Sequence, residues 1–196
     1  MYFDSHGTPL PHAGDSTNSP TPAINATTGE PTETKIEQVL LVIETDEAEL
    51  YVGDLFRRKF GGNPPDFPKH FIALYSKDSS HWQAVGYVNF WQRESAFMCG
   101  GLVIEDRAYK AMSKSHRALI KTHGGIAEIV LGTSIKMLPD NDVVWGMVGD
   151  TQAERVDMRV GFVHTHIDQI IAYWNKPFDD AEKHHLTEEI VTVGPF

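Results

Sequence analysis

The sequence predicts a mixed α/β fold in which a mainly antiparallel sheet is flanked by helices. Short runs rich in β-branched and aromatic residues alternate with longer stretches of helical periodicity. In the middle of the chain three strand-like runs follow one another with only turns between them, which favours antiparallel neighbours. A chain of 196 residues, with 41% hydrophobic and 22% charged residues, is sufficient for one domain with its own core.

The N-terminal segment differs in composition from the rest. Residues 1–34 are rich in Pro, Thr, Ser, Gly and Asn and contain almost no aliphatic side chains. Such a segment buries too little apolar surface to offset its ordering entropy. We therefore expect a disordered tail over 1–34 and one folded domain over 35–196.

The first half of the domain is predicted to form a strand, a helix and three strands. The aliphatic run 36–43 is of strand length, and Thr45 and Asp46 offer capping oxygens for a helix that ends at Gly61. Three further runs have strand character, over residues 70–75, 82–90 and 96–104. Gly100-Gly101 interrupts the last of these runs, which indicates a bulge or a close backbone approach.

The second half alternates helices and strands. Thr151 and Glu154 have capping-box spacing at the start of one helix, and Gly161 ends it. The last twenty residues give no clear assignment. The expected elements are a helix over 107–120, a helix from Gly125 to Pro139, a strand over 143–149, a helix over 151–161, and strands over 162–165 and 169–174.

The net charge and the cysteine content limit the kinds of function that the protein can have. The formal net charge is −10, with 27 acidic and 17 basic residues, which argues against affinity for nucleic acid or an anionic membrane. Cys99 is the only cysteine, so an intrachain disulfide is excluded. The sequence also lacks a run of membrane-spanning length and a secretory signal, so we expect a cytoplasmic protein.

The glycine pair before the second long helix is a candidate anion site. Free N–H groups at a helix start bind phosphate well, and glycine lets the backbone approach the ligand. Gly124-Gly125 before Ile126 supplies this arrangement, although the same pair is also common in ordinary loops.

Three segments together resemble the GNAT acyltransferase superfamily. Gly101–Asp106 resembles the end of that family's fourth strand, and Val143–Gly149 its fifth strand. The segment from Asp150 to Phe162 resembles the helix that follows and its Gly-Phe exit. The resemblance implies a sheet splayed between these two strands and a site for acetyl-CoA or another acyl-CoA.

The resemblance also implies which residues bind the cofactor. Backbone groups of Leu102, Val103 and Ile104 would pair with the pantetheine arm, although core packing alone also accounts for these aliphatic side chains. The pyrophosphate would lie at the loop and helix start formed by Thr122, His123, Gly124, Gly125, Ile126 and Ala127. Thr122 stands where the family usually has Gln or Arg, and an inserted segment precedes the loop. Asp157 stands where many members have a tyrosine acid.

Amine attack on a thioester requires a base and an oxyanion donor, and an acid for the thiolate would help. We expect Asp157, Tyr173 and Glu105 as catalytic candidates, with solvation or packing as the alternative for each. Glu94 and Asp150 are further candidates for the base. Cys99 reads as a buried structural cysteine rather than a nucleophile.

Histidines recur late in the sequence, at His164 and His166 and at His184-His185. No Cys or HExxH-type cluster accompanies them, so we expect surface histidines and no metal site.

The predicted function is transfer of an acyl group from acyl-CoA to an amine, carried by a small molecule or a peptide. The alternative is an acyl-CoA-binding regulatory domain without turnover, and a weaker one is a related fold that binds no CoA. Trp82, Trp91 and Trp174 allow a homodimer interface as readily as core packing.

Overall fold

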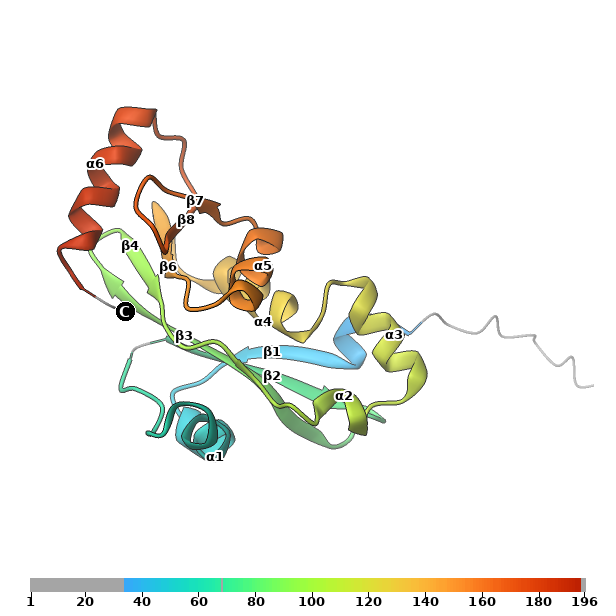
Figure 1. Cartoon of the computed structure of the whole chain (residues 1–196). Helices are drawn as coiled ribbons and strands as arrows, with labels where there is room; N and C mark the ends of the chain where they lie inside the picture. The colour runs from blue at the N-terminus through green and yellow to red at the C-terminus, as the bar shows by residue number, and fades with distance from the viewer. Residues whose placement is uncertain (1–33, 68, 195–196) are drawn as a thin grey trace, which may run out of the picture. The chain divides into compact units, whose positions relative to one another are not determined.

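The computed structural model describes residues 34–67 and 69–194, and Thr34–Phe196 form one compact unit (Figure 1). The predicted tail lies outside the described residues except for Thr34. Among the described helices none is long and apolar enough to cross a membrane.

The unit is built on an eight-stranded mixed sheet, which confirms the predicted fold class. The strand order is β1-β2-β3-β4-β6-β8-β7, and β5 pairs with β3 beside this path. Only β4 and β6 run parallel, and every other pair is antiparallel. The strands are β1 (Leu40–Glu44), β2 (Lys69–Ser76), β3 (Trp82–Arg93), β4 (Ala96–Cys99), β5 (Val103–Ile104), β6 (Val143–Met147), β7 (Val163–His164) and β8 (Ile170–Trp174).

Within the described residues, six α-helices and one short 3₁₀ helix accompany the sheet. Figure 1 shows α1 on one side of the central strands and α4 with α5 on the other. The helices are η1 (Ile36–Gln38), α1 (Ala48–Phe60), α2 (Ala108–Ala111), α3 (Lys114–Thr122), α4 (Ile126–Met137), α5 (Thr151–Val160) and α6 (Asp180–Val191).

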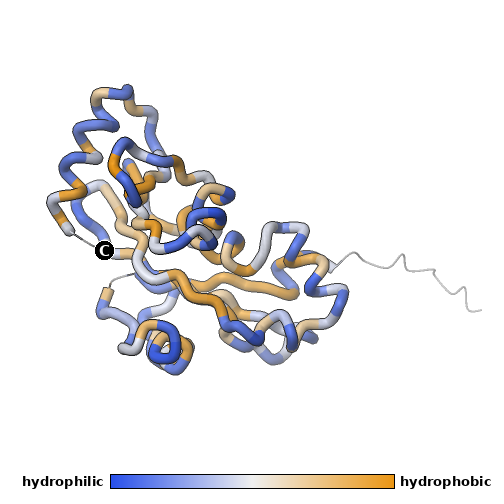
Figure 2. The backbone as a smooth tube through the Cα atoms, viewed as in Figure 1, coloured by the Kyte–Doolittle hydropathy of each residue, from blue (hydrophilic) through white to orange (hydrophobic). Residues whose placement is uncertain are grey.

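The two faces of the central strands form separate cores because side chains alternate along a strand. Phe71 of β2 packs in the larger core with Val130 of α4, whereas Ile72 packs in a second core with Val52 and Phe56 of α1. The central strands are accordingly the most continuously hydrophobic segments in Figure 2. Both faces are covered, which explains why these strands lack a polar alternation.

Three predicted boundaries were wrong for local reasons. Residues 36–38 form η1 rather than strand, because the Gln38 side chain accepts the Lys35 N–H at 2.9 Å. The helix expected over 107–120 is divided into α2 and α3, since Ser113 caps α3 through the His116 N–H. The cap of α5 is Asp150 rather than Thr151.

The C-terminal helix α6 was not assigned from the sequence, although its start carries a clear signal. The Asp179 carboxylate accepts the Glu182 N–H at 2.8 Å, and the Glu182 carboxylate accepts the Asp179 N–H at 2.8 Å. This reciprocal capping box satisfies two backbone donors that a helix start otherwise leaves free. Burial of Ile190 and Thr187 then fixes the helix to the domain.

Replacing the cap of α6 tests this assignment. We expect Asp179→Ala to lower the free energy of unfolding by about 1 kcal/mol, because it removes a capping hydrogen bond. Asp180→Ala, at the next position, serves as the control and should cost only a few tenths of a kcal/mol. Urea unfolding followed by circular dichroism measures both, and equal losses would contradict the assignment.

Candidate active site

The sheet opens between β5 and β6. β4 and β6 pair only from Ala96↔Val143 to Met98↔Trp145. Beyond Met98 the chain stays beside β3, with which both β4 and β5 pair, while β6 continues along β8. Among the described strands no ladder joins β5 to β6, so the predicted splay is present.

The glycine pair at the head of this split is required by close packing. The Gly100 N–H donates to the Asn89 carbonyl at 2.9 Å, and a Cβ on Gly100 would lie 2.5 Å from Asn89 Nδ2. A Cβ on Gly101 would lie 3.2 Å from the Phe60 ring. A side chain at Gly100 would therefore displace the buried amide of Asn89, and one at Gly101 would crowd Phe60.

The backbone of β5 presents a free edge to the split. The Glu105 N–H donates to the Val85 carbonyl at 2.9 Å, so Glu105 and Val103 direct their backbone groups toward β3. Because alternate residues of an antiparallel strand point to opposite edges, Leu102 and Ile104 direct theirs away from β3. The side chains of residues 102–104 pack in the two cores at the same time, so packing and a free backbone edge are compatible.

The predicted anion site is a helix start, but only part of it is open. Gly124 and Gly125 have φ values of 98° and 148°, and Gly125 is the N-cap of α4. The N–H groups of His123 and Gly124 donate to carbonyls of α3, and the Ile126 N–H donates to the Tyr109 hydroxyl at 2.9 Å. In residues 34–67 and 69–194, no protein group accepts the N–H of Gly125 or Ala127.

The side chains around this loop are not arranged as in a simple phosphate-binding site. The Thr122 hydroxyl donates to the Leu119 carbonyl at 2.7 Å, and His123 Nδ1 lies 2.9 Å from the same oxygen. Both side chains are therefore engaged with α3. The Glu128 carboxylate lies close above Gly125 and accepts from Arg159 Nη1 at 3.0 Å. It is 14% exposed and places a negative charge where an anion would bind.

An open cavity of about 380 Å³ connects these features. Ile104 of β5 and Ala127 of α4 line it, and α5 contributes Arg155 and Arg159. Arg155 is exposed and forms no ion pair within the described part of the chain. The cavity thus joins the free strand edge to the helix start and carries two guanidinium groups on its α5 wall.

Asp157 lies on α5, close enough to Cys99 at the end of β4 for its charge to act on that thiol. Its carboxyl is half-buried, and burial raises its pKa from 3.8 to about 7, with a further contribution from the negative charges of Asp150 and Glu154. Burial and the charge of Asp157 also raise the pKa of the Cys99 thiol. Cys99 is therefore a thiol at neutral pH, as expected from the sequence, whereas Asp157 is close to half protonated.

The other catalytic candidates have different surroundings, and the Tyr173 ring lies against Gly161 at the end of α5. Glu105 forms an ion pair with Arg58 of α1, and the two line a different cavity. The Tyr173 ring packs on Phe162 with centroids 5.8 Å apart. Of the two other candidate bases, Glu94 is exposed in the turn between β3 and β4, and Asp150 caps α5 through the N–H groups of residues 152 and 153.

The sequence analysis missed a buried polar group on the face of the split that α1 covers. Asn89 is fully buried, and neither its Oδ1 nor its Nδ2 has a hydrogen-bond partner among the described residues. On the neighbouring strand His70 Nδ1 lies 2.8 Å from the Tyr87 hydroxyl, and burial lowers the pKa of His70. An asparagine inside the apolar run 82–90 was the available signal, because buried amides normally have partners.

Comparison with known proteins yields similarity at the level of structure. No protein-family model matches the sequence, and no curated protein matches it. The structure is similar to the ribosomal-protein-S5-alanine acetyltransferase of Vibrio fischeri, at 10% identity and a TM-score of 0.46, over 75% of this chain and 97% of that one. It is also similar to a GNAT-family acetyltransferase of Streptococcus pneumoniae, at 14% identity and a TM-score of 0.44, over 69% and 99% of the two chains.

A third similar structure is a GNAT-family acetyltransferase of Brucella melitensis in complex with acetyl-CoA, at 9% identity and a TM-score of 0.41, over 71% of this chain and 90% of that one. The family that the sequence resembles is thus also the family of these similar structures. At these identities and scores the similarity concerns the course of the chain and not its activity.

Asp157 should make stability depend on pH in an unusual direction. The unfolded carboxyl loses its proton near pH 4, whereas the folded one retains it until about pH 7. Between these values the folded state binds more protons, so the free energy of unfolding falls as pH rises, by as much as about 4 kcal/mol. Asp157→Asn removes this loss, because asparagine does not ionise. The free energy of unfolding of the variant, relative to that of the wild type, should therefore be higher at pH 8 than at pH 4.5.

Urea unfolding at several pH values measures this difference. Asp168→Asn, at an exposed position, is the control and should follow the wild-type pH dependence. Parallel curves for Asp157→Asn and the wild type would show that Asp157 ionises normally.

Proposed function

We propose that the chain binds an acyl-CoA thioester in the split between β5 and β6 and transfers its acyl group to an amine. One observation carries the proposal: a free strand edge and a helix start with unpaired N–H groups open into one cavity with two arginines. Phosphate and a peptide-like arm are the chemical groups that such an arrangement accommodates.

The proposed binding mode follows the order of these groups along the split. The pyrophosphate accepts from the N–H groups of Gly125 and Ala127 and faces Arg155. The pantetheine amides pair with the backbone of Ile104 and Leu102 as an added strand would. The five residue steps from Ile104 to Cys99 span about 16 Å in an extended chain, so the arm ends near Cys99.

Asp157 is placed to act as the general acid. A carboxyl with a pKa of about 7 is protonated in a large fraction of molecules at neutral pH. When the amine attacks the thioester carbonyl and the carbon–sulfur bond breaks, the Asp157 proton passes to the leaving thiolate. The resulting carboxylate regains a proton from solvent. The raised pKa thus gives an aspartate the role that a phenol has in many members of the resembled family.

The acceptor amine is proposed to approach from the α1 side, where the unpartnered Asn89 amide lies against Gly100. The neutral imidazole of His70 on that side is chemically suited to remove a proton from an ammonium group. A small-molecule amine and a peptide amine both satisfy this chemistry. The expected lack of nucleic-acid binding rests on net charge alone, and it stays a prediction together with the cytoplasmic location and the homodimer.

Turnover and binding are tested separately. We expect acetyl-CoA at 100 times its dissociation constant to add about 2.7 kcal/mol of stability, and a panel of amines to release free thiol from it. Asp157→Asn should retain acetyl-CoA binding but lower kcat by about 100-fold or more, because the proton donor is lost. The wild-type kcat should fall above about pH 7, where Asp157 loses its proton. Absence of acetyl-CoA binding by the wild type would overturn the proposal.

A second candidate function is acyl-CoA binding without turnover, and one observation favours it. Tyr109 already accepts the Ile126 N–H, and the Glu128 carboxylate lies over Gly125. Both groups compete with a pyrophosphate for the same helix start. A site partly occupied by the protein's own groups is consistent with weak or regulated binding, and the thiol-release assay separates the two functions.

Removing the competing groups should strengthen cofactor binding. Tyr109→Phe frees the Ile126 N–H, and Glu128→Gln removes a negative charge and releases Arg159. Each change should tighten acetyl-CoA binding by about tenfold, corresponding to about 1.4 kcal/mol. Isothermal titration calorimetry measures this, with Asp168→Asn as the control that should bind as the wild type does. Weaker binding by both variants would indicate that Tyr109 and Glu128 contact the cofactor or hold the loop.

A further inference from the structure

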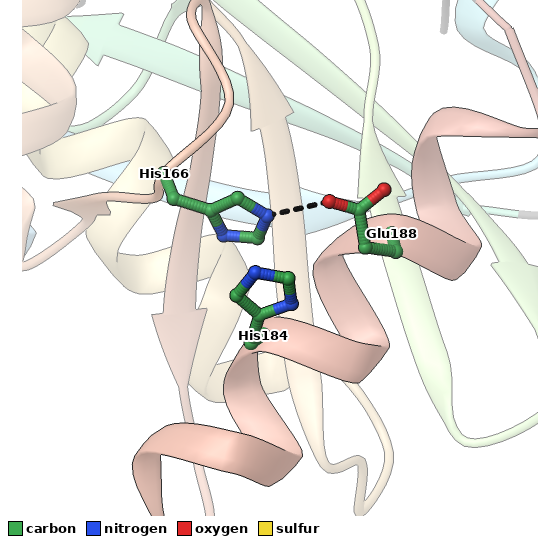
Figure 3. Close-up of side chains that lie close together, drawn as sticks. All are labelled: His166, His184 and Glu188. Atoms are coloured by element: carbon green, nitrogen blue, oxygen red, sulfur yellow. Dashed lines mark hydrogen bonds and ion pairs between the residues drawn. The ribbon is translucent and has the colours of Figure 1, made fainter.

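Two histidines and a glutamate converge on the side of the domain where α6 covers β8. His166 lies in the turn between β7 and β8, and His184 and Glu188 lie one helical turn apart on α6 (Figure 3). His166 Nε2 lies 2.8 Å from Glu188 Oε1. The His166 and His184 rings are stacked with their centroids 3.8 Å apart and an interplanar angle of 11°.

Both elements that carry these side chains are fixed by other contacts. The Thr165 hydroxyl accepts the Ile167 N–H at 3.1 Å and donates to the Ile170 carbonyl at 2.9 Å, which holds the turn that presents His166. The capping box holds the start of α6, and Ile190 anchors its far end in a core with Trp145. The three side chains therefore come together on rigid supports and not by chance contact of mobile loops.

The donor set and its dimensions suit a divalent metal. One ligand atom from each residue lies within 4.8 Å of the others, and all three residues are exposed. Tetrahedral zinc with ligands at about 2.1 Å separates its donor atoms by about 3.4 Å, so small side-chain rotations are sufficient. The imidazole nitrogen of histidine is a common zinc ligand.

We propose that His166, His184 and Glu188 form a zinc-binding site with a water as the fourth ligand. Imidazole nitrogen favours zinc over magnesium and calcium, which prefer oxygen donors. Loss of a proton from any protonated histidine accompanies binding, and Glu188 gives up its hydrogen bond with His166 to coordinate the ion. The ion would link the β7–β8 turn to α6. The neighbouring hollow, lined by Asp180 and Thr187, gives solvent access.

The site is independent of the proposed acyl-CoA site. His164, two residues before His166, contacts Glu154 at 3.3 Å and belongs to a different set of contacts. His185 lies beside His184 in the sequence but contacts Glu189 at 3.4 Å instead. These two histidines are matched controls, since both are exposed and contribute no ligand, His185 lies on the same helix as His184, and His164 lies two residues before His166.

Zinc binding to the full chain, after treatment with EDTA, tests the proposal by isothermal titration calorimetry. We expect a one-to-one complex of micromolar or tighter affinity, and a rise in the unfolding temperature on adding zinc. His184→Ala and Glu188→Gln should each weaken binding at least tenfold, while His185→Ala and His164→Ala should stay within about twofold of the wild type. Cobalt(II) should give visible absorption typical of tetrahedral coordination, and this should be lost in His166→Ala.

Two results would overturn the proposal. One is no heat of zinc binding at about 100 µM zinc, a concentration on the order of a hundred times the largest dissociation constant expected. The other is equal weakening by His185→Ala and His184→Ala, which would assign the binding to scattered histidines. The acyl-transfer assay is not part of this test, so either proposal stands without the other.

Discussion

The end of the β4–β6 ladder after Met98 is the constraint on which the proposed chemistry depends. Up to that point β4 and β6 pair in parallel, and beyond it each strand follows a different neighbour. Gly100 lies close to Asn89 at this point and Gly101 lies close to Phe60, so a side chain at either position would crowd these neighbours. A sheet that continued to pair would leave no backbone donor or acceptor for a cofactor.

The split also sets the electrostatics of Asp157. A carboxyl on a surface helix ionises near pH 4, but Asp157 faces the sheet at the point where it opens and is flanked by two other carboxylates. Burial disfavours its charged form, and the charges of Asp150 and Glu154 act in the same direction. Asp150 is itself fixed by capping α5, so the helix that carries Asp157 also places the charge that raises its pKa. Perturbed groups of this kind concentrate at functional sites.

The order of the elements was predicted because it depends on patterns within single segments, whereas the splay was implied by the resemblance to the GNAT superfamily. The glycine pairs and the alternation of apolar runs are such patterns. The sequence did not predict that Tyr109 would bind the Ile126 N–H, because those residues meet only after α2 and α3 fold. The same applies to His166 beside His184, which are brought together by the packing of α6. Glu128 lies only three residues after Gly125, in the first turn of α4, so its position over Gly125 was within reach of the sequence. The residues of the α6 capping box could be recognised in the sequence. The helix was not assigned because the segment after them lacks a clear apolar periodicity.

Competition at the start of α4 decides how the two proposed functions relate. A helix N-terminus stabilises one negative group at a time, since its partial charge of about half a unit is shared by all groups near it. Glu128 supplies that group within the chain and is itself paired with Arg159. A pyrophosphate carries more negative charge than one carboxylate, and the helix start alone does not neutralise it. It therefore displaces Glu128 only if the side chains of Arg159 and Arg155 also contact it. Under both proposed functions, binding of the pyrophosphate requires this exchange, because the Glu128–Arg159 pair otherwise keeps a carboxylate at the helix start.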